Sequence, residues 1–147
     1  MLQPYYKNYN KRLVKSPKLY FYDTGLIASL LGLEEPRQLE THYLRGELFE
    51  NMVVSEFVKK AYAQGREPNL YFWRDSNNEE VDLLEEYGAT LNCYEIKSSA
   101  TMHTEHFKSL KSFAKNDGLD ITRLHVVYGG DEDVQTSNGS YISWKNL

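Results

Sequence analysis

The chain has 147 residues, of which 41% are hydrophobic and 26% charged, and its formal net charge is −4. This composition is typical of one globular domain with a possible extension, and no apolar run approaches the ~18 residues that a membrane span requires. The N-terminus lacks the apolar segment of a secretory signal, so we expect a soluble, cytoplasmic protein. The single cysteine, Cys93, excludes an internal disulfide and a zinc knuckle, and we expect it to pack in the core.

Basic charge is concentrated at the start of the chain. Residues 1–22 hold no acid and five of the twelve tyrosines, whereas the other 125 residues hold 21 acids and 12 bases. Basic residues interleaved with aromatic ones can bind a nucleic-acid strand through its phosphates and bases. The same composition also suits an irregular segment whose tyrosines pack on a neighbouring domain. The five bases are Lys7, Lys11, Arg12, Lys15 and Lys18.

Two helices are predicted in the first half of the chain. Residues 24–31 form a short apolar helix, which Asp23 or Thr24 can cap and which needs a partner surface. A longer helix is predicted from Thr41, as a plausible cap, to Gly65, as its end. Its apolar residues cover most of its circumference, so we expect it to be buried on more than one side.

The second half of the chain alternates between strands and a helix. Three β-rich runs separated by short turn sequences predict an antiparallel meander, at residues 70–75, 79–87 and 90–99. An amphipathic helix, an interior strand and a final short strand follow, at residues 104–117, 123–130 and 140–144. The fold class is therefore α/β, with an N-terminal helical extension.

Charged residues interrupt the predicted central strands where apolar residues are expected. Glu95 and Lys97 are two residues apart, so a strand projects both side chains to the same face. Asp82 lies among apolar residues of the preceding strand, and a tight turn near Gly88 would bring the two strands side by side. Three charges can then converge at one end of the sheet.

A fourth candidate lies on the long helix. Glu50 shares a stripe with Val53, Val54 and Phe57 at helical spacing, so it sits on an apolar face. A carboxylate in such a stripe needs a chemical reason, because burying it without compensation costs several kcal/mol. Glu47 is a weaker candidate, because its own stripe is more polar.

Carboxylates held together in this way need cations. Lys97 can supply one positive charge, and a divalent metal the other. Oxygen ligands suit Mg²⁺ or Mn²⁺ rather than zinc, which makes Glu50, Asp82 and Glu95 candidate metal ligands. Such a metal polarises a phosphate and lowers the pKa of a water, while Lys97 positions that water or stabilises the developing charge. That chemistry is phosphodiester hydrolysis.

A purely structural interpretation of the same residues is also open. Cross-strand Glu and Lys pairs are common on solvent-facing strands, and a Glu-x-Lys triplet occurs by chance in roughly every second chain of this length. The catalytic interpretation gains weight because Asp82 and the pair of Glu95 and Lys97 fall on consecutive predicted strands. These strands follow a helix that carries its own apolar-face carboxylate.

Four ordered motifs cover nearly the whole chain: "KRLVKSPKLYFYDTGL", "RGELFENMVVSEF", "LYFWRDSNNEEVDLL" and "YEIKSSAT". With the order of the elements, they resemble the PD-(D/E)xK nuclease superfamily. They are more similar still to the uncharacterised domain at the C-terminal end of many prokaryotic AAA-type ATPases. The resemblance implies a restriction-endonuclease-like core in residues 38–147. It also implies that residues 1–37 are the tail of a linker or winged-helix region behind an ATPase module.

The resemblance also implies roles for particular residues. It places the helix glutamate of the family at Glu50, the strand aspartate at Asp82, and the Glu-x-Lys pair at Glu95 and Lys97. The chain departs from the pattern at Val81, where a proline would precede the aspartate.

Two functions remain as expectations. The first is Mg²⁺- or Mn²⁺-dependent phosphodiester hydrolysis of DNA or RNA by a C-terminal domain whose partner is the ATPase module. The second is a catalytically silent nuclease-like module that binds a partner or nucleic acid for the ATPase, since the main domain is acidic. No glycine is followed by Lys and then Ser or Thr, so no ATP site of the phosphate-loop type is expected in this chain.

Overall fold

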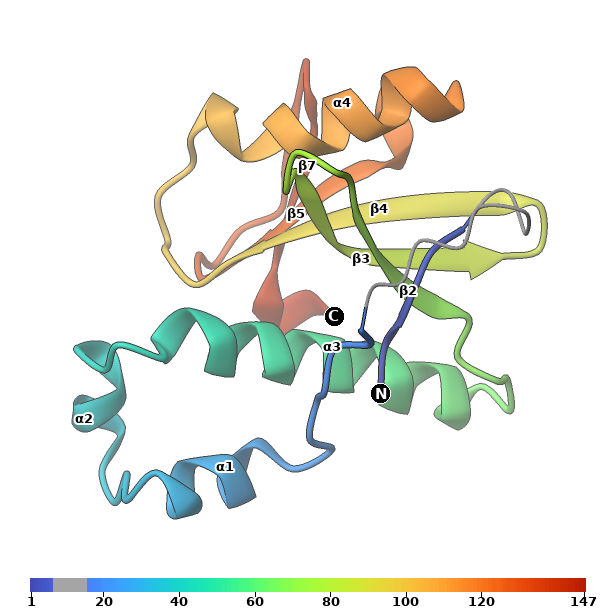
Figure 1. The fold of residues 1–147 in the computed structure, drawn as a ribbon. Helices are drawn as coiled ribbons and strands as arrows, with labels where there is room; N and C mark the ends of the chain where they lie inside the picture. The colour runs from blue at the N-terminus through green and yellow to red at the C-terminus, as the bar shows by residue number, and fades with distance from the viewer. Residues whose placement is uncertain (7–15) are drawn as a thin grey trace.

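The computed structural model describes residues 1–6 and 16–147, and these residues form one seven-stranded mixed sheet in the order β1-β2-β3-β4-β5-β7-β6 (Figure 1). The strands are β1 (Gln3–Pro4), β2 (Leu70–Arg74), β3 (Glu80–Tyr87), β4 (Thr90–Lys97), β5 (Leu124–Tyr128), β6 (Val134–Thr136) and β7 (Gly139–Ser143). The α-helices are α1 (Thr24–Leu30), α2 (Pro36–Glu40), α3 (Arg45–Ala63) and α4 (Lys108–Asp117). Short 3₁₀ helices are η1 (Thr104–Phe107), η2 (Ile121–Arg123) and η3 (Trp144–Asn146).

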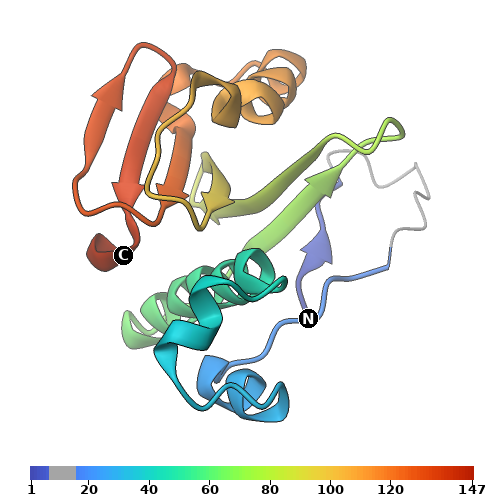
Figure 2. The ribbon, with the colours of Figure 1, turned by 90° about the vertical axis from the view of Figure 1, so that its left-hand side faces the viewer.

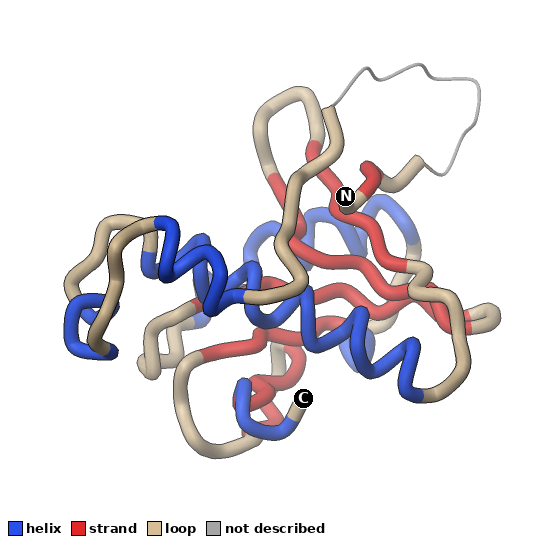
Figure 3. Tube along the Cα trace, turned by 90° about the horizontal axis from the view of Figure 1, so that it is seen from below, coloured by secondary structure: helices blue, strands red, loops and turns tan. Residues whose placement is uncertain are grey.

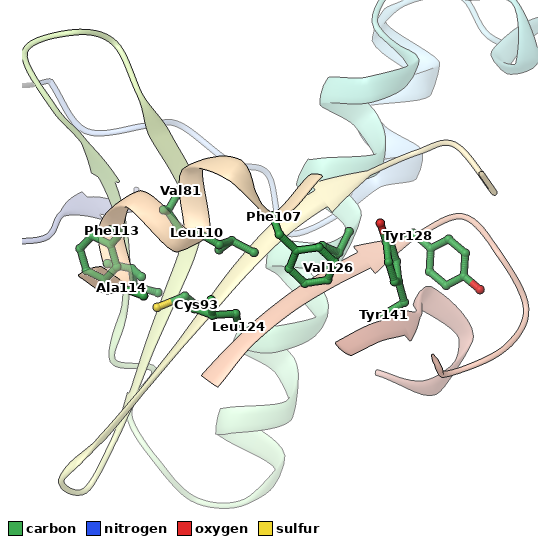
Figure 4. Close-up of a cluster of buried hydrophobic side chains, with 11 residues drawn as sticks. Val81, Cys93, Phe107, Leu110, Phe113, Ala114, Leu124, Val126, Tyr128 and Tyr141 are labelled. Carbon is green, nitrogen blue, oxygen red and sulfur yellow. The ribbon is translucent and has the colours of Figure 1, made fainter. Parts of the chain in front are cut away.

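Helices α3 and α4 lie on opposite faces of the sheet, which separates two hydrophobic clusters (Figure 1). On the α4 face, Leu110 and Phe113 of the helix pack with Cys93 of β4, as Figure 4 shows. On the α3 face, Val54 and Phe57 pack with strand residues that include Leu83 and Ile96. Neighbouring strand residues thus alternate between the two clusters, as the pleat of a strand requires. The predicted core position of Cys93 is confirmed.

The predicted meander is confirmed, and the sheet as a whole is mixed. β2, β3 and β4 pair antiparallel in sequence order, and β4 then pairs parallel with β5. β5 is interior, because β7 pairs parallel with its other edge. The strands can be followed as one layer in Figure 3, which views the molecule from below. The sequence does not predict the short strands β1 and β6.

The start of the long helix is where the sequence prediction is wrong. Thr41 ends α2 as its C-cap, and the chain turns through His42 before α3 begins at Arg45. The predicted end holds, because Gly65 adopts a left-handed conformation (φ 68°) just past Gln64, the C-cap. In Figure 2, α1 lies on the side of α3 away from the sheet, and α2 crosses in front of α3.

The N-terminal extension is part of this fold. β1 pairs parallel with β2 at the edge of the sheet, and Tyr5 packs edge-on against Tyr71 and Phe113. This tyrosine therefore packs on the chain's own sheet. The nucleic-acid interpretation depends on bases that mostly lie outside the described residues, namely Lys7, Lys11, Arg12 and Lys15.

Helix α1 begins as predicted, because the Asp23 carboxylate accepts the backbone amides of Gly25 and Leu26 at 2.8 and 3.2 Å. None of its residues is buried, and the side chain of Leu30 is 71% exposed. Among the described helices, none has the length and apolar character that a membrane crossing demands.

Candidate functional site

Asp82 lies where β3 and β4 part. The paired register of the two strands runs from Tyr87 opposite Thr90 to Leu83 opposite Tyr94. One residue further, the Asp82 carboxylate instead accepts the backbone N–H of Ile96 at 2.8 Å. The pairing of β2 with β3 shifts register in the same region, so β3 changes course there.

Burial raises the pKa of the Asp82 carboxyl to about 8. The negative charges of Glu95 and Glu50 add to this rise, whereas the amide of Ile96 and the ammonium of Lys97 oppose it. Burial, reinforced by the two nearby carboxylates, therefore keeps Asp82 from being fully ionised near neutral pH.

Glu95 and Lys97 form an ion pair at the end of β4. Lys97 Nζ donates to Glu95 Oε1 at 2.6 Å, and 38% of the lysine side chain is exposed against 12% of the glutamate. The other carboxylate oxygen, Glu95 Oε2, is buried and has no hydrogen-bond partner among the described residues. Burial raises the pKa of Glu95, and the charge of Lys97 offsets part of the rise. A buried oxygen with no donor calls for a further partner, such as a water molecule or a bound ion.

Three of the four predicted site residues line one pocket. Glu50, Asp82 and Lys97 surround a space of about 280 Å³, together with other residues from α3 and β4. Glu95 is not in that lining, although its charge acts on Asp82 and its side chain holds Lys97. The remaining lining residues are Gly46, Glu47, Ile96 and Ser98.

The N-terminal extension adds a fifth charged residue to the site. Lys18 Nζ lies 3.0 Å from Glu50 Oε1 and also pairs with Glu80 of β3. The hydroxyl of Tyr20 donates to the same Glu50 oxygen. Arg74 of β2 pairs with Glu80 from the other side.

Lys18 and Tyr20 were not predicted as site residues, although the sequence contains one signal that relates them. Two residues that are two apart in an extended segment project to the same side, as Lys18 and Tyr20 do. The local pattern does not, however, predict Glu50 as their partner. Glu50 lies 32 residues from Lys18 and 30 residues from Tyr20 in the sequence.

No ready-made metal site is present in residues 1–6 and 16–147, since no three His, Cys, Asp or Glu side chains form a group that could hold an ion. Lysine ammonium groups instead pair with Glu50 and Glu95. The donor set nevertheless fits a hard cation such as Mg²⁺ or Mn²⁺. All candidate ligands are carboxylates, Glu95 Oε2 is unpartnered among the described residues, and Asp82 has a raised pKa.

Known protein families and curated relatives match most of the chain. Residues 45–147 match the family described as "Domain of unknown function (DUF4143)", and residues 1–37 match "Domain of unknown function (DUF8612)". The chain is 34% identical over 131 residues to Uncharacterized protein Rv2008c of Mycobacterium tuberculosis and to Uncharacterized protein Mb2031c of Mycobacterium bovis.

These alignments cover 88% of this chain but only 28% of each relative, so the chain spans less than a third of the length of these curated proteins. No solved structure matches the chain significantly. The family match covers more than half of the chain and includes the segments that carry Glu50, Asp82, Glu95 and Lys97. The chain therefore belongs to the DUF4143 family.

Proposed function

We propose that this chain is the nuclease-like domain of a longer protein and hydrolyses phosphodiester bonds of nucleic acid with Mg²⁺ or Mn²⁺. The observation that carries the proposal is the pocket shared by Glu50, Asp82 and Lys97, where Lys97 also pairs with Glu95. The other oxygen of Glu95 is buried and has no partner among the described residues. Carboxylates gathered with too few cations must either take up a proton or be completed by another cation.

In this proposal the carboxylates bind the metal, and Lys97 stabilises negative charge on the substrate. Glu50, Asp82 and Glu95 would hold the divalent ion through carboxylate oxygens. When bound, such an ion supplies Lewis-acid chemistry at a phosphate group. Lys97 reaches the pocket with a charged ammonium that can stabilise the negative charge developing on that phosphate.

The protonation state of Lys97 supports this role. Burial lowers its pKa, but the facing carboxylates of Glu95, Asp82 and Glu50 outweigh burial, and the pKa is raised overall. Lys97 is therefore a permanent cation near neutral pH and acts by charge rather than by accepting a proton.

The finer fold and the partner belong to the same proposal. The succession of α3, the β2–β4 meander, α4 and parallel β5 supports a restriction-endonuclease-like core. The resemblance to the C-terminal domains of AAA-type ATPases supports an ATPase module as the partner. The length of the relatives beyond the aligned part leaves room for such a module. ATP hydrolysis by a full-length relative, assayed with and without this domain, tests the partnership.

The decisive experiment is a cleavage assay with single- and double-stranded DNA and RNA in Mg²⁺ or Mn²⁺. We expect the wild type to cut at least one substrate and Lys97→Met to lose about 10²–10³-fold in rate, as removal of a charge-stabilising donor does. Lys59→Met is the matched control, because Lys59 lies exposed on α3 and pairs only with Glu56 among the described residues. Equal rates for wild type and Lys97→Met would refute the proposal.

A second candidate function is a nuclease-like module that binds without cutting. It is favoured by one observation, namely that Lys18 and Lys97 already pair with Glu50 and Glu95 without a metal. Calorimetry with Mn²⁺ separates the two functions. Binding that Asp82→Asn abolishes supports hydrolysis, whereas no binding at millimolar Mn²⁺ supports the silent module.

A further inference from the structure

Two donors from the N-terminal extension bind one oxygen of Glu50. Lys18 Nζ lies 3.0 Å from Glu50 Oε1, and the Tyr20 hydroxyl donates to the same atom. This arrangement leaves Oε2 as the oxygen through which Glu50 can bind an ion in the pocket that it lines. Glu50 is thus attached at one oxygen and available at the other.

The segment that carries these donors is itself fixed at both ends. The backbone of Lys18 exchanges hydrogen bonds with the backbone of Leu2, at 2.8 and 3.0 Å. Asn51, which follows Glu50 on α3, accepts the N–H of Phe21 at 2.7 Å and donates to its carbonyl at 2.9 Å. The buried side-chain amide of Asn51 therefore holds the segment against the helix that carries Glu50.

Lys18 also separates two like charges. Its ammonium lies between Glu50 of α3 and Glu80 of β3, and Arg74 pairs with Glu80 from the other side. Without Lys18, Glu50 would lose a donor and would face Glu80 with no cation between them. The Tyr20 hydroxyl would then be the remaining donor to Glu50 Oε1 among the described residues.

Lys18 has two opposing effects on a metal at the pocket. Its positive charge repels a cation, but pairing with Glu80 neutralises most of that charge. Its hydrogen bond keeps Glu50 in place, and losing a group that orients a ligand typically weakens metal binding by about 10–100-fold. Orientation therefore outweighs repulsion.

We propose that Lys18 and Tyr20 are positioning residues that orient Glu50 toward a divalent ion. The proposal rests on the metal site of the proposed function and extends it, because it makes the N-terminal extension a part of that site.

The test measures the Mn²⁺ dissociation constant of the full chain by calorimetry. Lys18→Met removes the charge and the donor at similar side-chain length, and Tyr20→Phe removes one hydroxyl without any change of charge. We expect both variants to weaken Mn²⁺ binding by about tenfold or more, and Lys18→Arg to regain part of the loss. Arg74→Met is the charge-matched control. It removes a nearby cation from Glu80 rather than Glu50, so it should leave the affinity within about threefold.

The outcomes separate this inference from the proposed function. A wild type that binds no Mn²⁺ at millimolar concentration overturns both. A wild type that binds, together with Lys18→Met and Tyr20→Phe at unchanged or tighter affinity, overturns the positioning role alone. Tyr20→Phe keeps the test decisive if Lys18→Met does not fold, because it deletes a single hydroxyl.

Discussion

The carboxylate of Asp82 accepts the backbone N–H of Ile96, so a side chain takes the place that a neighbouring strand would fill. β4 continues to Lys97 beyond the last residue pair that it shares with β3. Beyond that pair, the backbone N–H of Ile96 is therefore satisfied by the Asp82 side chain rather than by a backbone carbonyl of β3. A continued ladder would satisfy the same amide, so pairing of the backbone does not by itself require a carboxyl at this position.

Asp82→Asn should stabilise the metal-free protein at alkaline pH. Burial, Glu95 and Glu50 raise the pKa of Asp82 from 3.8 to about 8. A carboxyl with a raised folded-state pKa stabilises the fold while it is protonated, so the free energy of unfolding falls as pH rises between these two values. Asparagine does not ionise, and urea unfolding at pH 5 and pH 9 should show a smaller decline for the variant. A variant less stable than wild type at pH 9 would contradict this prediction.

His125 should produce the opposite dependence on pH. Burial lowers its pKa from 6.5 to about 4, and its Nδ1 lies 2.6 Å from Ser140 Oγ. The unfolded chain therefore takes up the proton first, and the free energy of unfolding falls as pH drops from 6.5 toward 4. His125→Gln should flatten this decline. Urea unfolding at pH 4.5 and pH 7 measures the slope, and identical slopes for the two proteins would refute the assignment.

Gly129→Ala should disturb the end of β4. A Cβ at Gly129 would lie 2.3 Å from the backbone oxygen of Ser98, and the Gly129 amide donates to the carbonyls of Lys97 and Ser99. We expect a loss of about 1–3 kcal/mol in the free energy of unfolding, as for other overpacked sites. Gly46→Ala is the matched control. Its Cβ would meet no atom within 4 Å, so helix propensity alone should add up to about 1 kcal/mol.

Leu110→Ala should test the core on the α4 face. Leu110 is fully buried, and its truncation should cost about 2–5 kcal/mol of unfolding free energy. Leu30→Ala on exposed α1 should change the same quantity by less than about 0.5 kcal/mol. Equal losses in a denaturant titration would mean that α1 is covered in solution.

Periodicity predicted most of the fold and much of the candidate site. Alternation put Glu95 and Lys97 together on one strand, and helical spacing singled out Glu50 on the apolar face of α3. These residues could be found because a strand and a helix repeat over a few residues, and the tight turn at Gly88 makes the pairing of β3 with β4 local.

The parts that sequence could not predict depend on distant partners. β1 has two residues and pairs with β2 across more than sixty positions, so no repeat marks it. Lys18 reaches Glu50 from an extended segment without periodicity. Thr41 has the chemistry of an N-cap, yet it is the C-cap of α2, and His42 instead accepts the backbone N–H of Leu44 just before α3.

The single thiol of the chain lies in the middle of its sheet. Cys93 has no exposed surface, and burial raises its pKa to about 12, so the reactive thiolate is suppressed in the native state. A thiol-specific dye can therefore label the protein only when the sheet opens. Because the chain has one cysteine, the rate of labelling of the wild-type protein measures how often the sheet opens.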